Sequence, residues 1–301
     1  IIKRKSAVKP ITGSIVDSTN IDDKTKNVST EEHYSNKGLK TDVSAFTMLQ
    51  YKPIKGMVLS GNVQYRYAAF DYLDYVDRDN SFYRKDKNTE WGFCNYGINF
   101  EYTPINSSKI YAKYNNVNRE PTRSDMFGGN ENFTGELATI THENAKDVEV
   151  GVEYALGNQI YVNANLYNMW FKNELVLNGE YGKNGLPCHD NAIKSFRRGI
   201  ELDVKWRIVG FFNLDVNGSV SQNKAVTDTF GKTNHILTPT TTFNADLYWD
   251  NYDFNIGFDT NYRSKLYVDM NNEHSIPYLW TLNFHGMYRY KNVEFGVRVN
   301  N

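Results

Sequence analysis

The chain has few cysteines, almost no net charge and no long apolar run. Cys94 and Cys188 are its two cysteines and form no CxxC pair, which argues against a zinc site or a disulfide scaffold. The formal net charge of -1 lacks the basic stripe of a nucleic-acid-binding protein, so we expect no nucleic-acid partner. No stretch of about 18 apolar residues is present, which excludes a membrane-spanning helix. The chain begins at Ile1 without a signal peptide, and we expect it to be processed or part of a longer protein.

Aromatic residues are abundant. They make up 15% of the chain, with 22 Tyr and 17 Phe, although the mean hydropathy is -0.62. A water-soluble core of this size relies mainly on Leu, Ile and Val. Tyr and Trp suit boundaries where one end of the side chain is apolar and the other is wet. The composition therefore favours a protein with an extensive boundary between apolar and aqueous surroundings.

Two stretches alternate strictly between apolar and polar residues. From Ile200 to Trp206 every second residue is apolar and each intervening residue is charged. From Asp147 to Tyr154 the apolar residues likewise occupy every second position. A period of two is what a β-strand shows when its two faces meet different media. Each of these strands is therefore expected to separate a dry face from a wet one.

The same pattern predicts an all-β chain with about twelve strands and no convincing helix. Residues 1–40 lack periodicity and are expected to form a loop or linker, whereas 41–301 are expected to form strands and their connections. The predicted strands are 41–51, 57–70, 91–103, 109–117, 146–155, 159–171, 196–206, 211–224, 239–249, 253–267, 279–290 and 292–300.

The connections between these strands alternate in length. Tight turns follow every other strand, and the intervening connections are long: 71–90, 118–145, 172–195, 225–238 and 269–278. Outer-membrane β-barrels have this asymmetry, with short periplasmic turns and longer extracellular loops. The pattern therefore predicts an antiparallel transmembrane β-barrel in the bacterial outer membrane.

Charge and aromatic placement support a membrane barrel over a soluble β-sandwich or propeller. We expect no Asp, Glu, Lys or Arg at outward positions, because a charge at the bilayer midplane costs about 2 to 4 kcal/mol. Twelve or more strands enclose a lumen too wide for side chains to fill. Each strand that enters a tight turn ends in an aromatic residue, as an interfacial girdle requires: Tyr51, Tyr102, Tyr154, Trp206, Trp249 and Tyr290.

Five stretches carry a family resemblance. Residues 33–42 (HYSNKGLKTD), 64–66 (QYR), 119–127 (REPTRSDMF), 165–179 (NLYNMWFKNELVLNG) and 191–201 (NAIKSFRRGIE) resemble segments of TonB-dependent outer-membrane receptors of the Bacteroidota type. The resemblance implies a barrel of about 22 strands with a plugged lumen, of which this chain would be the C-terminal part. It also implies uptake driven by the TonB–ExbB–ExbD complex through a plug and TonB box that this sequence does not show.

Loop and lumen residues are the candidates for ligand binding. Arginines can hold anionic groups bidentately, which singles out Arg119, Arg123 and Arg197. Aromatic rings can stack on a flat or glycosidic ligand, which singles out Trp170, Tyr181 and Tyr267. The alternative for each is ordinary loop packing, and for Trp170 an upper aromatic girdle.

No combination of nucleophile, base and orienting group stands out, so we expect no enzymatic activity. Cys188, His189 and Asp190 are adjacent, yet one cluster without a second half seldom makes a metal site, and we expect none. His142 lies in a loop where haem receptors carry a ligand, but the accompanying Asn-Pro-Asn-Leu is absent. We therefore expect no bound cofactor.

The sequence thus predicts a TonB-dependent transporter of a scarce ligand, such as a ferric siderophore, haem, cobalamin or an oligosaccharide. Its expected partners are outer-membrane lipid and the TonB complex, with a surface lipoprotein as a further candidate. The alternative is a passive porin or a structural outer-membrane barrel protein.

Overall fold

The computed structural model describes residues 35–78, 81–128, 140–182 and 185–301, so most of the expected N-terminal loop lies outside it. Twelve long antiparallel strands form one sheet in chain order. They are β1 (Ser35–Tyr51), β2 (Met57–Arg78), β3 (Ser81–Ile105), β4 (Ser108–Arg119), β5 (Glu143–Leu156), β6 (Ile160–Lys172), β9 (Lys194–Val209), β10 (Phe212–Thr227), β12 (Thr241–Asp250), β13 (Phe254–Arg263), β16 (Leu279–Tyr290) and β17 (Val293–Val299).

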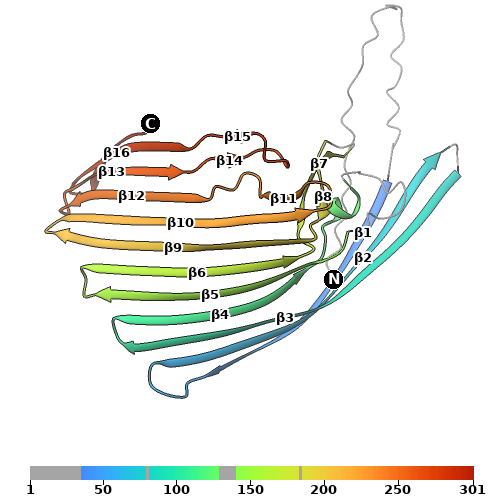
Figure 1. Cartoon of the computed structure of the whole chain (residues 1–301), viewed down its shortest axis with the longest axis horizontal. Helices are drawn as coiled ribbons and strands as arrows, with labels where there is room; N and C mark the ends of the chain where they lie inside the picture. Colours follow the sequence, from blue (N-terminus) through green and yellow to red (C-terminus); the bar gives the residue numbers. More distant parts are fainter. Residues whose placement is uncertain (1–34, 79–80, 129–139, 183–184) are drawn as a thin grey trace, which may run out of the picture.

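The sheet is curved, and its two ends differ (Figure 1). Tight turns gather at one end, and the long connections gather at the other with the short elements. These are α1 (Arg123–Met126), β7 (Leu175–Tyr181), β8 (Pro187–Asn191), β11 (Gly231–Asn234), β14 (Leu266–Tyr267) and β15 (Ser275–Ile276). In the part of the chain described, the sheet stays open between β1 and β17.

None of the described helices is long and apolar enough to cross a membrane.

The strand register confirms that the sheet has one apolar and one polar face. Residues paired across antiparallel strands point to the same side. One register row contains only apolar residues: Ile110, Val152, Ala164, Leu202, Gly218, Phe243, Tyr262 and Trp280. The adjacent row contains only polar ones: Lys109, Glu153, Asn163, Asp203, Asn217, Asn244, Asn261 and Thr281. The apolar face suits lipid, and the polar face suits a wet lumen.

The lower aromatic girdle is also confirmed. The six aromatic residues expected there lie beside the tight turns, on the same face as Leu202 by register. Four of them are at least two-fifths exposed, as expected of rings that meet bilayer rather than protein: Tyr51, Tyr154, Trp206 and Tyr290. Their shared height marks the periplasmic interface.

The expectation of no outward charges is wrong at the opposite end of the strands. Lys146 pairs with Trp170, and Lys224 pairs with Phe196, on the face that carries Leu202. Arg198 lies on this face between Phe196 and Ile200. These cations lie beyond the apolar rows, toward the long loops, where the hydrocarbon no longer excludes charge.

Several element bounds differ from those predicted. β1 begins at Ser35, six residues early, and β2 and β3 continue as a paired hairpin through the expected loop 71–90. Residues 71–78 pair with 81–88 although these stretches lack the period-two pattern that reveals the other strands. The predicted strand 253–267 ends at Arg263, and one helical turn forms at α1.

A glycine on the lumen face accommodates a neighbouring tyrosine. Gly151 pairs with Tyr111, whose side chain is buried, and a Cβ built on Gly151 would lie 2.3 Å from Tyr111 Cζ. We expect Gly151→Ala to destabilise the fold by about 1 to 3 kcal/mol, because the ring must leave its place. Urea unfolding of the purified protein in detergent would measure the change.

Gly61→Ala is the matched control for this prediction, because a Cβ there meets only one backbone oxygen, at 3.8 Å. Gly151→Ala should cost less stability in a Tyr111→Ala background than in the unaltered protein. Equal effects of Gly151→Ala in the presence and absence of the Tyr111 ring would contradict the steric explanation.

Candidate ligand-binding site

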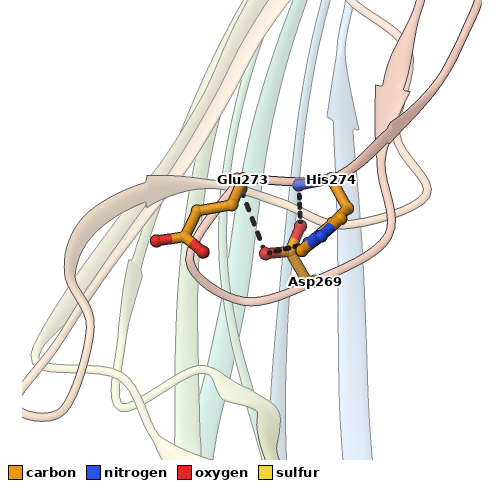
Figure 2. Close-up of side chains that lie close together, drawn as sticks. All are labelled: Asp269, Glu273 and His274. Atoms are coloured by element: carbon orange, nitrogen blue, oxygen red, sulfur yellow. Dashed lines mark hydrogen bonds and ion pairs between the residues drawn. The ribbon is translucent and has the colours of Figure 1, made fainter.

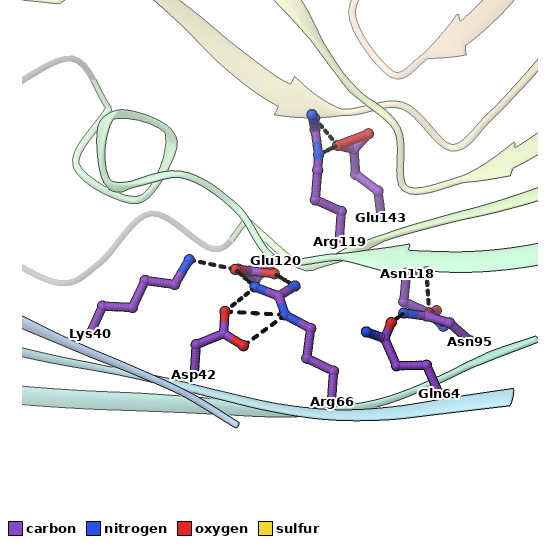
Figure 3. Close-up of polar contacts among 9 residues, drawn as sticks. All are labelled: Lys40, Asp42, Gln64, Arg66, Asn95, Asn118, Arg119, Glu120 and Glu143. Carbon is purple, nitrogen blue, oxygen red and sulfur yellow. Dashed lines mark hydrogen bonds and ion pairs between the residues drawn. The ribbon is translucent and has the colours of Figure 1, made fainter. Parts of the chain in front are cut away.

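The connection after β4 folds back onto the lumen face of β1 and β2. Glu120 follows the last residue of β4, and its carboxylate lies between Lys40 and Arg66 (Figure 3). The Glu120 oxygens accept hydrogen bonds from Lys40 Nζ at 2.7 Å and from Arg66 Nη1 and Nη2 at 2.7 and 2.8 Å. Arg66 also pairs with Asp42. The loop is therefore tied to strands that lie two and three places away in the sheet.

Glu120 is the buried centre of this cluster. Its side chain is 8% exposed, whereas that of Lys40 is 51% exposed. Burial by itself would raise the pKa of Glu120, but the hydrogen bonds from Arg66 and Lys40 outweigh it and lower the pKa from 4.5 to about 2. Glu120 is therefore ionised at any physiological pH.

The helix α1 follows within the same loop. Thr122 and Asp125 form a capping box, in which each side chain accepts a hydrogen bond from the other residue's backbone N–H. The buried Met126 and Phe127 pack against Tyr72 on β2, with Phe70 and Trp91 beside them. The apolar contact and the ion pairs of Glu120 hold α1 against the lumen wall.

Arg123 of α1 lies over two of these rings. Its guanidinium carbon is 5.6 Å from the Tyr72 centroid and 5.1 Å from the Phe127 centroid. The two rings lie 4.6 Å apart. The Arg123 side chain itself is exposed, so it presents a cation above an aromatic base.

The β7–β8 hairpin lies against α1. His189 Nδ1 is 3.1 Å from Asp125 Oδ1, and the Cys188 thiol donates to the carbonyl of Gly128 at 3.3 Å. Cys188 and His189 thus connect the β7–β8 hairpin to the α1 loop. Cys94 and Cys188 are both free thiols. We refer to α1 and the β7–β8 hairpin together as the inner layer, because both fold toward the lumen side.

A second buried carboxylate lies where this hairpin begins. Glu174 is 5% exposed and accepts hydrogen bonds from Ser195 and Arg197 of β9. His235 Nε2 lies 3.5 Å from Glu174. Burial lowers the pKa of His235, and its two charged neighbours act oppositely, Glu174 raising it and Arg197 lowering it. The ion pair with Arg197 anchors the base of the hairpin to the lumen wall.

The six sequence candidates occupy different places. Arg123 and Tyr181 belong to the inner layer, with Tyr181 75% exposed. Arg197 lies beside the layer over the Phe171 ring at 4.6 Å, and Arg119 pairs with Glu143. Two candidates lie apart from the layer: Tyr267, in β14 beside Lys265, and Trp170, on the outward face with Phe196. Their ligand-binding roles stay predictions.

Sequence reasoning missed the buried carboxylates that hold the site together. Glu120 and Glu174 both lie in stretches that carry the family resemblance, yet the ligand contacts predicted there are arginines and aromatic residues. A single Glu at the end of a polar strand has no periodic signal. The long-range contacts with Arg66 and Lys40, 54 and 80 residues away in sequence, identify Glu120 as an anchor.

Asp269, Glu273 and His274 form a cluster in the loop between β14 and β15 (Figure 2). The Asp269 oxygens accept the backbone N–H groups of Glu273 at 3.0 Å and His274 at 2.8 Å. Burial raises the pKa of Asp269, and these N–H groups outweigh it, so that the net shift is downward. The Asp269 carboxylate therefore holds the backbone of residues 269–274 in a closed turn. The His274 side chain is largely exposed.

The pKa of Glu120 predicts how loop ordering depends on pH. A lowered carboxylate pKa contributes stability that is fully present above about pH 4.5 and is lost as the pH falls toward 2. We expect hydrogen-exchange protection of residues 122–127, corrected for intrinsic rates, to stay constant from pH 7 to pH 5. It should then fall below pH 4. Loss of protection between pH 7 and pH 5 would contradict this assignment.

Comparison with known proteins agrees with this geometry. Residues 10–301 match the family model described as TonB dependent receptor-like, beta-barrel. No curated protein matches the chain. Among solved structures, the chain is similar to the ferric yersiniabactin uptake receptor FyuA from Yersinia pestis, with 15% identity and a TM-score of 0.68 over 89% of this chain and 42% of that one.

Two further structures share the fold. The copper transporter OprC is 15% identical, with a TM-score of 0.73 over 88% of this chain and 42% of that one. The FrpB iron transporter from Neisseria meningitidis is 18% identical, with a TM-score of 0.65 over 89% of this chain and 41% of that one. The chain therefore spans about two fifths of the length of these structures.

The family match covers nearly the whole chain, and the register separates a lipid face from a polar lumen face. The chain therefore belongs to the TonB-dependent receptor family and forms β-barrel wall in the bacterial outer membrane.

Proposed function

We propose that this chain forms part of a TonB-dependent transporter that imports a scarce ligand across the outer membrane. The ligand classes that fit are a ferric siderophore, haem, cobalamin or an oligosaccharide. Family membership supports TonB-dependent transport, and the solved relatives include an uptake receptor, an iron transporter and a copper transporter.

The observation that carries the proposal is the inner layer at the extracellular end. Its two loops fold toward the lumen, are joined to each other through Asp125 and His189, and are fixed to the wall by Glu120 and Glu174. Loops fixed to the wall in this way present ordered surfaces toward the lumen. A receptor that must recognise its ligand requires preformed surfaces.

The exposed groups of this layer indicate the ligand chemistry. Arg123 presents a cation above the Tyr72 and Phe127 rings, and Tyr181 exposes a further ring. A guanidinium pairs with carboxylate or phenolate oxygens, and aromatic rings stack on flat or glycosidic groups. An anionic ligand with a planar or sugar component therefore fits best.

A growth screen tests the proposal. A deletion strain of the source bacterium should lose growth on one member of a panel of iron complexes, cobalamin and glycans, each supplied as the limiting nutrient. The complete gene should restore that growth, and a second strain lacking TonB should show the same defect. If the restored growth does not require TonB, the result would support the alternative of a passive porin and would contradict the proposal.

An Arg123→Gln variant sharpens the assignment of the ligand. If Arg123 contacts an anionic ligand, the variant should require about 10 to 100 times more ligand for half-maximal growth, since a charge-assisted hydrogen bond contributes about 1.5 to 3 kcal/mol. Lys265→Gln, immediately before β14, is the matched control, because it also removes one extracellular cation. An equal effect of both variants would argue against a specific role for Arg123.

A further inference from the structure

A group of cations lies on the outside of the barrel at its extracellular end, on the lipid face of β5, β6, β9, β10 and β11. Register places Lys146, Lys224 and Arg198 on this face, and strand alternation adds the lysines near the ends of β6, β9 and β11. We call this set the basic belt: Lys146, Lys172, Lys194, Arg198, Lys224 and Lys232.

The basic belt has no acidic partner. Among the described residues, none of the six forms an ion pair with a carboxylate, whereas the lumen-facing Lys109 and Lys113 pair with Glu153 and Glu149. The outward positions of β5, β6, β9, β10 and β11 in this region hold no Asp or Glu. Since this sector carries uncompensated positive charge, it suits an anionic neighbour.

The height of the belt on the barrel identifies that neighbour. One register row consists of Val150, Leu166, Ile200 and Val220, all apolar. The row two residues further up contains Arg198, and the next contains Lys146 and Lys224, each row being about 7 Å along the strand from the last. The cations therefore begin where the hydrocarbon ends, at the level of lipid headgroups.

Two aromatic rings lie within the belt. Trp170 is 46% exposed and lies between Lys146 and Phe196 in the register. Arg198 and Lys232 lie over the Phe196 ring at 5.1 and 5.9 Å. Aromatic rings at this height mark the upper membrane interface. They place the cations within reach of phosphate groups just above the acyl chains.

We propose that the basic belt binds the phosphate groups of a phosphorylated glycolipid of the lipid A type in the outer leaflet. The apolar rows below the belt contact the acyl chains of the same molecule, and the cations contact its headgroup. Guanidinium and ammonium groups both bind phosphate, the former bidentately. A protein partner would have to displace lipid from the continuous apolar face beneath, so lipid fits the surface better.

Titration of the complete receptor in detergent micelles with bisphosphorylated lipid A tests the proposal, with native mass spectrometry as the readout. The variant Lys146→Gln/Arg198→Gln/Lys224→Gln should bind on the order of 100-fold more weakly, since each basic residue near a charged lipid surface contributes about 1 kcal/mol. Lys52→Gln/Lys55→Gln/Lys291→Gln removes three exposed lysines from the tight-turn end and should bind as the unaltered receptor does.

Two further probes complete the test. Dephosphorylated lipid A should bind as weakly to the unaltered receptor as lipid A binds to the belt variant. Phosphatidylglycerol should bind less tightly than lipid A. The proposal is overturned if the belt variant retains the affinity, if phosphate removal has no effect, or if phosphatidylglycerol binds equally well. A heat-modifiable band on gel electrophoresis shows that each variant is folded.

Discussion

Glu120→Ala is expected to release the α1 loop from the lumen wall. The substitution removes the hydrogen bonds that Lys40 and Arg66 donate to Glu120, and hydrogen bonds between charged groups contribute about 1.5 to 3 kcal/mol each. Trypsin cleavage after Arg123 requires local opening of the loop, and its rate follows the open population. In outer-membrane vesicles we expect cleavage to accelerate at least 100-fold.

Glu153→Ala is the matched control, because it also removes a lumen-facing carboxylate from an ion pair. Glu153 pairs with Lys109, but both side chains are about one third exposed, and exposed pairs contribute at most about 1 kcal/mol. Cleavage after Arg123 should therefore change less than about fivefold in this variant. Similar acceleration in both variants would show that the Glu120 cluster does not hold the loop.

Leu202→Arg is expected to destabilise the barrel itself. Leu202 lies in the middle of β9 and in the apolar register row, where a cation at the bilayer midplane costs about 2 to 4 kcal/mol. Unfolding by guanidinium in lipid vesicles would measure the loss of stability. The effect should shrink in detergent micelles, where the arginine can reach water.

The control for Leu202→Arg is Asn217→Arg on the lumen face. Asn217 is exposed there and pairs in register with Asp203, which can accept the new cation. We expect its free energy of unfolding to change by less than about 1 kcal/mol. Equal losses for the two variants would mean that the two faces are not in different media.

The barrel wall could be predicted from the sequence because the bilayer imposes a local rule. Ile200–Trp206 alternates since each residue meets either hydrocarbon or water, and the same rule located all twelve long strands. The rule gives no signal where a strand lacks this alternation. Residues 71–78 and 81–88 lack it, so the pairing of β2 with β3 beyond Phe70 does not follow from the sequence.

The candidate site was less predictable for a different reason. The Glu120 anchor depends on Arg66 and Lys40, which lie far away in sequence and become neighbours only when the loop folds back over β2. Arg198 was missed as an outward charge, because the prediction assumed that the lipid face extends to the strand ends. Trp170, which seemed a ligand contact by residue type, lies on the outward face by register.

Cysteine labelling at Leu202 and Asp203 tests the central assignment of the two faces most directly. Cys94 and Cys188 are first replaced by serine, and each position is then changed singly, as Leu202→Cys or Asp203→Cys. In intact outer membranes, a membrane-impermeant thiol reagent should modify the variant at position 203, which faces the lumen, and spare the variant at position 202, which faces lipid. Modification at position 202 without modification at position 203 would reverse the register and contradict the assignment of the two faces.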